Sequence, residues 1–146
     1  MTPKEIITVG QIQLSFLLDG EDTNNESVMF EMVIPYGAKV PMPHYHIDVD
    51  EIVYSLEGIT TTTINGESTD LNPGDHIFVP RGAVHHHENI NHGDARSLCV
   101  LTPASIGPAY FRELVTILTK GAPPDPNEMK AIMAKHGLIA APHPVK

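Results

Sequence analysis

The sequence has one cysteine, few cationic side chains and no long apolar run, and each shortage excludes a class of protein. Its single cysteine, Cys99, cannot form a disulfide within the chain. Lysine and arginine number 9 against 18 acidic residues, which gives a net charge of −9 and argues against a nucleic-acid partner, because phosphate backbones require clustered cations. No segment reaches the roughly 18 consecutive apolar residues that cross a bilayer. Because Met1 to Leu18 alternates polar and apolar residues instead of forming a secretion signal, we expect a cytoplasmic protein with no membrane partner.

The chain has material for one sizeable core, since it contains 146 residues of which 41% are hydrophobic. Short β-prone runs separated by turn residues occupy its first two thirds, which is typical of a barrel or sandwich. We therefore predict an all-β fold, an antiparallel barrel over residues 1–102 with a C-terminal pair of short helices over 103–137 and a tail over 138–146. The expected strands are Ile6 to Val9, Gln11 to Leu18, Ser27 to Ile34, Glu51 to Leu56, Ile59 to Ile64, Ser68 to Leu71, His76 to Val79 and Arg96 to Thr102.

Two turns are expected to connect neighbouring strands. Asn65-Gly66 supplies the positive φ angles of a two-residue hairpin. Asn72-Pro73-Gly74-Asp75 is typical of a type II turn, with proline at the first central position and glycine at the second.

The segment after Thr102 has the pattern of two helices. The first is expected from Pro108 to a stop at Gly121, and the second from a cap at Asp125 to Gly137. We expect their apolar stripes to pack on the outside of the barrel or on a second subunit. Exposed barrel edges and these stripes together favour a homodimer.

Histidine is unusually abundant, with 9 residues in the chain. His44 and His46 are two residues apart, so on a strand their side chains point to the same face. Glu51 follows at an odd interval from His46, and a bend through residues 47–50 is needed to aim it at the same place. A third histidine, His85, follows a turn that contains Pro80 and Gly82. These side chains predict a metal site.

Two motifs in this region resemble those of the cupin superfamily. Gly37-x6-His44-x-His46-x4-Glu51-x6-Gly58 is similar to the first cupin motif, although the family usually has five residues between the glycine and the first histidine. Gly74-x5-Pro80-x-Gly82-x2-His85-x3-Asn89 is similar to the second. The resemblance implies a jelly-roll barrel, often dimeric, that holds a metal through His44, His46, Glu51 and His85. The helical segment lies outside it.

Three imidazoles and one carboxylate suit a divalent transition metal, Fe, Mn, Ni, Co, Cu or Zn, and suit Ca or Mg poorly. If the metal is six-coordinate, positions remain open for water, substrate or dioxygen, as in catalytic sites. Glu51 has two readings, a metal ligand or a catalytic general base. His87 is two residues from His85, so its side chain could face the cavity as a neighbour of the metal site, and the sequence leaves this orientation open. His86 is expected to point the opposite way, toward solvent or a partner.

Several other residues have structural interpretations. Glu88 and Asn89 are expected to stabilise a turn, and Cys99 to be buried and inert. Surface or hydrogen-bonded roles are expected for His76, His92, His136 and His143.

Three functions are compatible with such a site. The first is an oxidoreductase similar to small quercetin dioxygenase-like cupins, acting on a small organic substrate in a cavity walled by the small residues Val53, Ser55 and Val79. The second is a metal-dependent isomerase or decarboxylase acting on a sugar or keto acid, which would call on Lys39 or Arg81 to hold an anion. The third is a non-catalytic small-molecule-binding cupin.

Overall fold

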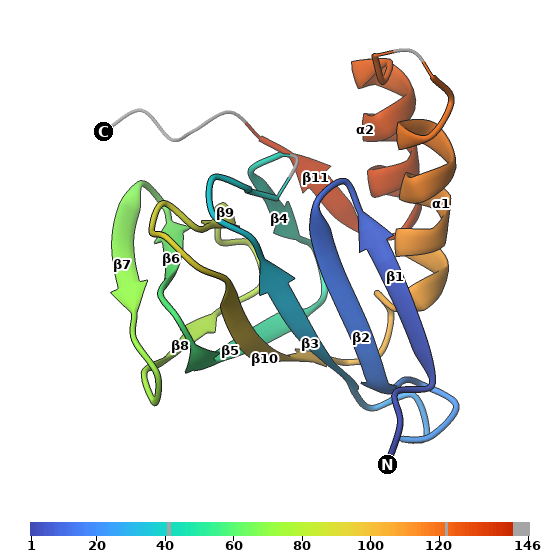
Figure 1. Ribbon diagram of the computed structural model, residues 1–146. Coiled ribbons are helices and arrows are strands. Elements are labelled where there is room, and N and C mark those ends of the chain that lie inside the picture. Colours follow the sequence, from blue (N-terminus) through green and yellow to red (C-terminus); the bar gives the residue numbers. More distant parts are fainter. Residues whose placement is uncertain (41, 122, 142–146) are drawn as a thin grey trace.

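The computed structural model describes residues 1–40, 42–121 and 123–141 (Figure 1). Each strand predicted from the sequence is present with its ends shifted by at most one residue, and short strands carry the histidine motifs. The strands are β1 (Glu5–Val9), β2 (Ile12–Leu18), β3 (Val28–Ile34), β4 (His44–His46), β5 (Asp50–Glu57), β6 (Thr60–Ile64), β7 (Glu67–Leu71), β8 (His76–Val79), β9 (His85–Glu88), β10 (Ala95–Thr102) and β11 (Leu138–Ala140), and the helices are α1 (Pro108–Leu118) and α2 (Pro126–Lys135).

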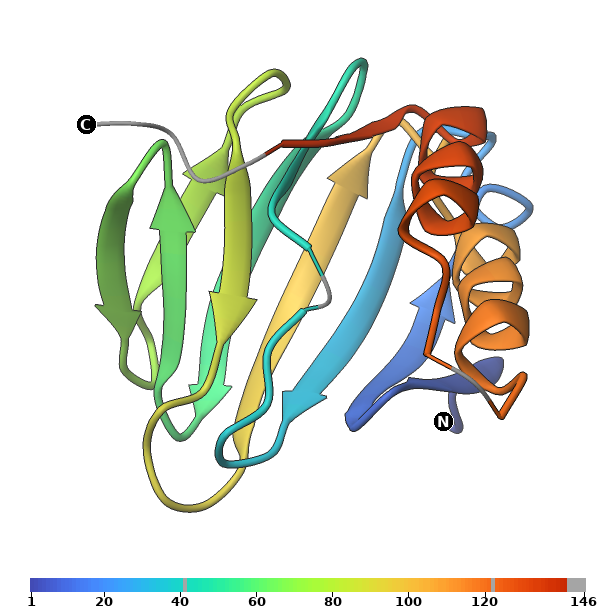
Figure 2. The same cartoon turned by 90° about the horizontal axis from the view of Figure 1, so that it is seen from above.

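The strands of the described residues form two antiparallel sheets that face each other (Figure 2). One has six strands in the order β1-β2-β3-β10-β5-β8, and the other has five in the order β11-β4-β9-β6-β7. The predicted all-β fold with a jelly-roll type barrel and two C-terminal helices is therefore confirmed. The two histidine-bearing strands, β4 and β9, are neighbours in the five-stranded sheet, and β5 lies in the other.

Alternating side chains explain how these strands enclose a core. In β3 every second residue is buried, Val28, Phe30, Met32 and Ile34, while the residues between them are partly exposed. This period of two places one face of the strand in the barrel. Burial of each such side chain contributes roughly 1.5–3 kcal/mol, so the core holds the barrel together.

The two predicted turns have different roles. Asn65 and Gly66 both have positive φ, 48° and 86°, and connect the paired strands β6 and β7 as expected. Gly74 has the positive φ expected of it, 94°, but the prediction that its turn joins neighbouring strands is wrong, because β7 and β8 belong to different sheets. The Gly74 amide donates to the carbonyl oxygen of Ser55 at 2.9 Å, which directs the chain across to pair with β5.

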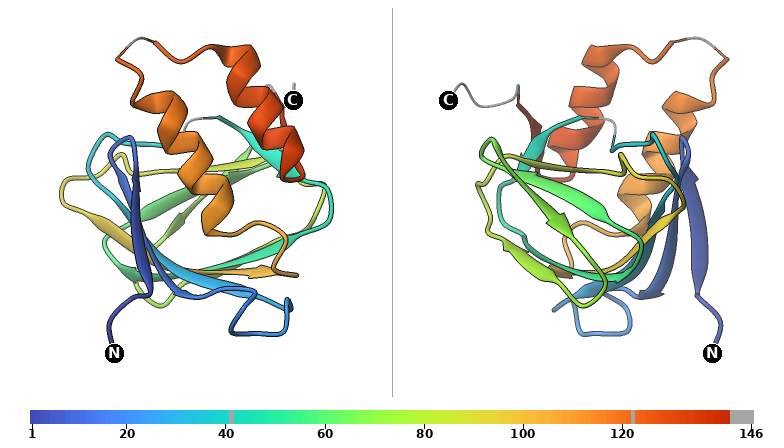
Figure 3. Two further views of the ribbon diagram at one scale, coloured as in Figure 1. Left: turned by 90° about the vertical axis from the view of Figure 1, so that its right-hand side faces the viewer. Right: turned by 60° about the vertical axis from the view of Figure 1, so that its left-hand side comes forward.

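Helices α1 and α2 lie side by side at one end of the barrel, with α1 next to β1 (Figure 3). Asp125 caps α2 as predicted, accepting from the amide of Asn127 at 2.9 Å. The strand β11 differs from the expected tail over 138–146, since it pairs antiparallel with β4. His143 lies outside the described residues. Neither helix of the described chain has the length and hydropathy of a membrane span.

Candidate metal centre

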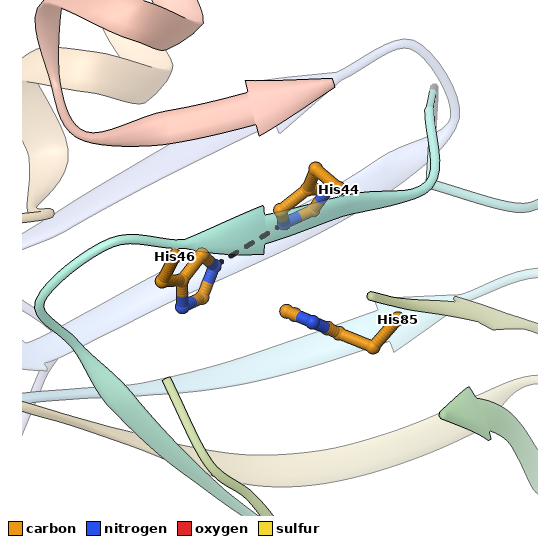
Figure 4. Close-up of side chains that lie close together, drawn as sticks. All are labelled: His44, His46 and His85. Atoms are coloured by element: carbon orange, nitrogen blue, oxygen red, sulfur yellow. Dashed lines mark hydrogen bonds between the residues drawn. The ribbon is translucent and has the colours of Figure 1, made fainter. Parts of the chain in front are cut away.

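Strands β4 and β9 bring three histidines together, as predicted. His44 and His46 point to the same face of β4, and His44 is the cross-strand partner of His85 on β9. The three rings converge in Figure 4, and one nitrogen from each lies within 4.8 Å of the other two. The Nε2 atoms of His44 and His46 are 3.2 Å apart. Two ligands at 2.0–2.1 Å from one tetrahedral metal lie about 3.3 Å apart, so this spacing fits a shared ion.

Backbone contacts hold these histidines in place. The amide of Gly82 donates to the carbonyl oxygen of His46 at 2.8 Å, so the turn that precedes β9 is joined to β4. On the other side, β11 pairs with β4 through Leu138 and His46, Ile139 and Tyr45, and Ala140 and His44. The histidine-bearing face of β4 is thus fixed from both edges.

The hydrogen bonds of His44 and His85 make their Nε2 atoms acceptors, and that of His44 faces His46 Nε2. His44 Nδ1 donates to the carbonyl oxygen of Met42 at 2.8 Å, and His85 Nδ1 donates to that of Ala83 at 2.9 Å. In a neutral imidazole the other nitrogen then carries a lone pair. His85 Nε2 is buried and has no hydrogen-bond partner, and such an orphaned acceptor is costly unless a cation occupies the position in front of it. The residues present therefore fit a metal ion.

Burial keeps these imidazoles neutral. It lowers the pKa of His44 from 6.5 to about 3, with further lowering from His85 and His46. Burial also lowers the pKa of His85 to about 4, against the opposing effect of Glu51. The pKa of His46 is lowered for the same first reason. Neutral imidazole is the form that binds metals, so the cluster is ready for a cation at neutral pH.

Glu51 reaches the cluster through the predicted bend. Residues 47–49 leave β4 as a bend and the chain enters β5 in the opposite sheet, where Glu51 is buried and faces inward. Its Oε2 is 3.9 Å from His85 Nε2. Burial acts to raise the pKa of Glu51, but the hydrogen bond from His87 and the charges of the histidines outweigh it, so the net pKa is lowered. Glu51 is therefore a carboxylate.

His87 faces the interior and contacts Glu51 directly. Its Nε2 is 2.8 Å from Glu51 Oε2, and its Nδ1 is 2.9 Å from Thr62 Oγ1 on the adjacent β6. Glu51, His85 and His87 form a second group of potential ligand atoms that shares His85 with the first. The sequence left the orientation of His87 open. Its hydrogen bond with Thr62 was not predicted, because a threonine in a run of β-branched residues is typical of an ordinary strand.

Two neighbours of the cluster also have clear positions. His86 is not exposed to solvent, because only 9% of its surface is accessible; its cross-strand partner on β6, Thr63, is also buried. The alternative that it faces a partner stays a prediction. Asn89 stabilises the turn as expected, donating to the carbonyl oxygens of Ile34 and Gly93 at 2.9 and 2.8 Å.

The histidine cluster opens on an apolar cavity of about 80 Å³. Barrel side chains such as Leu14, Met32 and Leu101 line one part of it. The rest is a roof, defined as the cavity-lining residues of the helices and β11: Tyr110, Phe111, Leu114, Met129, Met133 and Leu138. The helix stripes thus pack on the barrel, as one of the two expected arrangements, and they also line its cavity, which was not expected.

The small residues expected to wall the cavity, Val53, Ser55 and Val79, are buried but do not line it. The cavity extends from Glu51 toward β1–β3 and the helices, whereas Val53 and Ser55 continue along β5 away from that side. The cations considered for anion binding do not line it either. Arg81 donates through its amide, Nε and Nη2 to the Asp50 carboxylate at 2.9–3.2 Å, and Lys39 is exposed.

Comparison with known proteins agrees with this geometry. The chain is 34% identical over 73 residues to the uncharacterized protein MJ1618 of Methanocaldococcus jannaschii, a match that covers 50% of this chain and 58% of that one. It is 32% identical over 94 residues to quercetin 2,3-dioxygenase of Bacillus subtilis, covering 64% of this chain and 27% of the relative. The chain thus spans less than two thirds of the length of these curated relatives.

A solved structure, a predicted oxalate decarboxylase from Thermotoga maritima, superposes with a TM-score of 0.63 at 29% identity, covering 70% of this chain and 93% of that one. The family described as Cupin domain matches residues 30–101, which include β3 to β10 apart from their outermost residues and all of the histidine cluster. With its antiparallel barrel and its cluster of histidines and glutamate able to bind a metal, the chain is a small member of the cupin superfamily.

Proposed function

We propose that the protein is a metal-dependent oxidoreductase of the dioxygenase kind that acts on a small, neutral and mainly apolar organic substrate. The observation that carries this proposal is the position of the histidine cluster at the end of a cavity whose other walls are apolar. Among the described residues, the cavity lining includes no lysine and no arginine. An anionic substrate would lose its hydration there without gaining a partner cation from a lysine or an arginine, which costs several kcal/mol.

His44, His46 and His85 would hold the metal, with Glu51 beside them as fourth ligand or as base. The bound metal would supply Lewis acidity toward an enol or phenol oxygen of the substrate. Glu51, a buried carboxylate, would accept the proton released from that hydroxyl group. The apolar roof would exclude water and orient the substrate, and both atoms of dioxygen, the oxidant, would enter the organic product.

The size of the cavity further limits which substrates can fit. A volume of about 80 Å³ holds several water molecules or one small organic molecule and lies well below the range of drug-sized ligand sites. This favours a short diketone or a single phenolic ring over a multi-ring substrate.

An oxygen electrode tests the proposal. Protein loaded separately with Fe²⁺, Ni²⁺ or Mn²⁺ is expected to consume dioxygen with a small diketone or phenol, and His46→Ala is expected to abolish consumption. His92→Ala is the matched control, because His92 is exposed and stacks on Tyr36 away from the cavity. No consumption above the blank with any metal across small diketones and phenols would overturn the proposal.

The second candidate is a decarboxylase or isomerase, which the 29% identity to the predicted oxalate decarboxylase favours. In that case a substrate carboxylate would contact the metal directly, since Arg81 is engaged by Asp50. Release of carbon dioxide from oxalate or a keto acid without net dioxygen consumption would support it. Tight binding of a ligand without turnover would support a non-catalytic binding protein. The homodimer and the cytoplasmic location expected from the sequence stay predictions.

A further inference from the structure

The outer face of the six-stranded sheet carries a row of apolar side chains that crosses five neighbouring strands. In β2, β3, β10, β5 and β8 (Figure 1), the aligned residues are Leu18, Met29, Val100, Ile52 and Phe78. Leu18, Ile52 and Phe78 are 40%, 45% and 55% exposed, and the other two are partly exposed. Because adjacent strands lie about 4.8 Å apart, the row is about 19 Å long.

Three further apolar side chains widen this row. Tyr54 and Leu56 follow Ile52 at every second position of β5, with exposed fractions of 42% and 40%. Leu98 is the cross-strand neighbour of Tyr54 on β10 and is partly exposed. We define the outer patch as these eight side chains: Leu18, Met29, Ile52, Tyr54, Leu56, Phe78, Leu98 and Val100.

The outer patch departs from the pattern of a solvated sheet. An antiparallel sheet with one face in water normally presents polar side chains on that face. Strand β7 of the other sheet follows this rule, since its exposed residues are all polar: Glu67, Ser68, Thr69 and Asp70. A contiguous apolar surface of this extent is typical of an interaction site.

The helices pack on the opposite face of the same sheet. Phe111 of α1 contacts the rings of Phe16 and Phe30, with centroids 5.7 and 6.1 Å away. Both of these phenylalanines are buried inside the barrel. Residues of α1 and α2 line the cavity there, so in the described part of the chain the helices leave the outer patch uncovered.

The charges around the outer patch favour a neutral partner surface. None of its eight side chains is charged. Arg96, two residues before Leu98 on β10, is engaged by Glu31 and Glu57, each at 3.4 Å. An acidic peptide or an anionic lipid therefore finds no free lysine or arginine within the patch.

Size and symmetry fit a second copy of the chain. With six strands and strand lengths up to eight residues, the outer face measures about 24 Å in each direction. Its area is of the same order as the roughly 800 Å² that each partner buries in a stable complex. A two-fold axis beside Val100, the middle residue of the row, lays the row of one copy on the row of the other.

We propose that the outer patch is the interface of a homodimer in which the six-stranded sheets of two copies pack face to face, about 10 Å apart. This surface was not among those that the sequence indicated, which were the barrel edges and the helix stripes. The cavity lies on the inner face of the sheet, so each copy keeps its own site. The inference concerns assembly and does not depend on the proposed reaction.

Sedimentation velocity of the full chain between about 1 and 100 µM tests the dimer. The unaltered chain is expected to reach twice the mass of one chain. Ile52→Lys and Phe78→Lys each place two unpaired ammonium groups in the interface and are expected to weaken the dimer by about 100-fold or more. Because both side chains are about half exposed in the single chain, we expect the fold to tolerate lysine there, and the Tm of each variant checks this.

Ile90→Lys is the matched control. Ile90 is 60% exposed and lies between β9 and β10, outside the sheet. The variant adds the same charge in place of the same kind of side chain, and it is expected to leave the dimer unchanged.

Hydroxyl-radical footprinting of the unaltered chain gives a second test that needs no variant. Oxidation of Tyr54 and Phe78 is expected to fall several-fold between dilute and concentrated samples. Tyr36, which is 53% exposed outside the outer patch, is expected to keep its rate. A chain that stays monomeric throughout would overturn the proposal. A dimer that neither lysine variant weakens, or one in which Tyr54 is oxidised equally at both concentrations, would overturn it as well.

Discussion

His85 pairs with His44 across β4 and β9, yet its buried Nε2 atom has no hydrogen-bond partner. Its Nδ1 is already engaged by the carbonyl oxygen of Ala83. An imidazole that is held rigidly in the interior with an unpartnered lone pair can bind a metal ion from solution. The first prediction follows from this arrangement.

Metal binding is expected to stabilise the fold through His85. A transition metal at about 100 times its dissociation constant contributes about 2.7 kcal/mol to the free energy of unfolding, which corresponds to a rise in Tm of about 5–10 °C for a chain of this size. Thermal shift assays with Mn²⁺, Ni²⁺, Co²⁺ and Zn²⁺ measure it. His85→Ala is expected to abolish the rise and His92→Ala to keep it; an equal rise in both variants would contradict the prediction.

Acid is expected to destabilise the metal-free protein. The pKa of His44 is lowered from 6.5 to about 3 and that of His85 to about 4 by burial, so below pH 6.5 the unfolded chain binds more protons than the folded one. The free energy of unfolding is therefore highest above pH 6.5. It falls as the pH drops toward 4, by at most about 1.4 kcal/mol per pH unit for each histidine.

Urea unfolding of the metal-free protein between pH 7.5 and 4.5 measures this dependence. His44→Gln removes one titrating group and is expected to flatten the curve. A free energy of unfolding that stays constant from pH 7 to 5 in the wild-type protein would contradict the prediction.

The roof is expected to set the size of the substrate. Met133 lines the cavity, so Met133→Ala should enlarge it and shift kcat/KM toward longer or bulkier substrates, with a loss of about 2 kcal/mol in unfolding free energy. Ile132→Ala is the control on the same helix, because Ile132 packs against the core without lining the cavity. It should lose stability without a change in size preference, and the same shift in both variants would disprove the role of Met133.

The pairing of β11 with β4 is expected to support metal affinity. Ile139→Pro removes a backbone donor in the middle of β11, opposite Tyr45. Because β4 carries two of the ligand histidines, we expect faster hydrogen exchange of the His44–His46 amides and a loss of about tenfold in metal affinity. Ala134→Gly, at an exposed position of α2, is the control for general destabilisation, and equal effects on exchange in β4 would count against the pairing.

Local patterns in the sequence determine much of this fold. The alternation in β3, the Asn65-Gly66 hairpin and the Asp125 cap each depend on neighbours along the chain, and each was predictable. The histidine cluster was predictable as well, because His44 and His46 share strand parity and the cupin motifs connect them to His85. The bend before Glu51 followed from the odd interval alone.

Long-range contacts could not be predicted in the same way. Strand β11 has only three residues, too few for a periodic signal, and it forms because β4 offers an unpaired edge. The apolar stripes of α1 and α2 have the same pattern whether they cover a cavity or a second subunit. The hydrogen bond from Thr62 to His87 joins residues 25 positions apart, and only the register of β6 with β9 brings them together.

The roof and the candidate metal ligands come from separate stretches of the chain. The roof residues lie between Tyr110 and Leu138, whereas the histidine cluster and Glu51 lie between His44 and His87. Substitutions in the helices can therefore alter the shape of the cavity while the histidine cluster stays unchanged, which makes the C-terminal segment a natural target for grafting new specificities. Such a graft must retain Leu138–Ala140, because these same residues also hold the strand of His44 and His46.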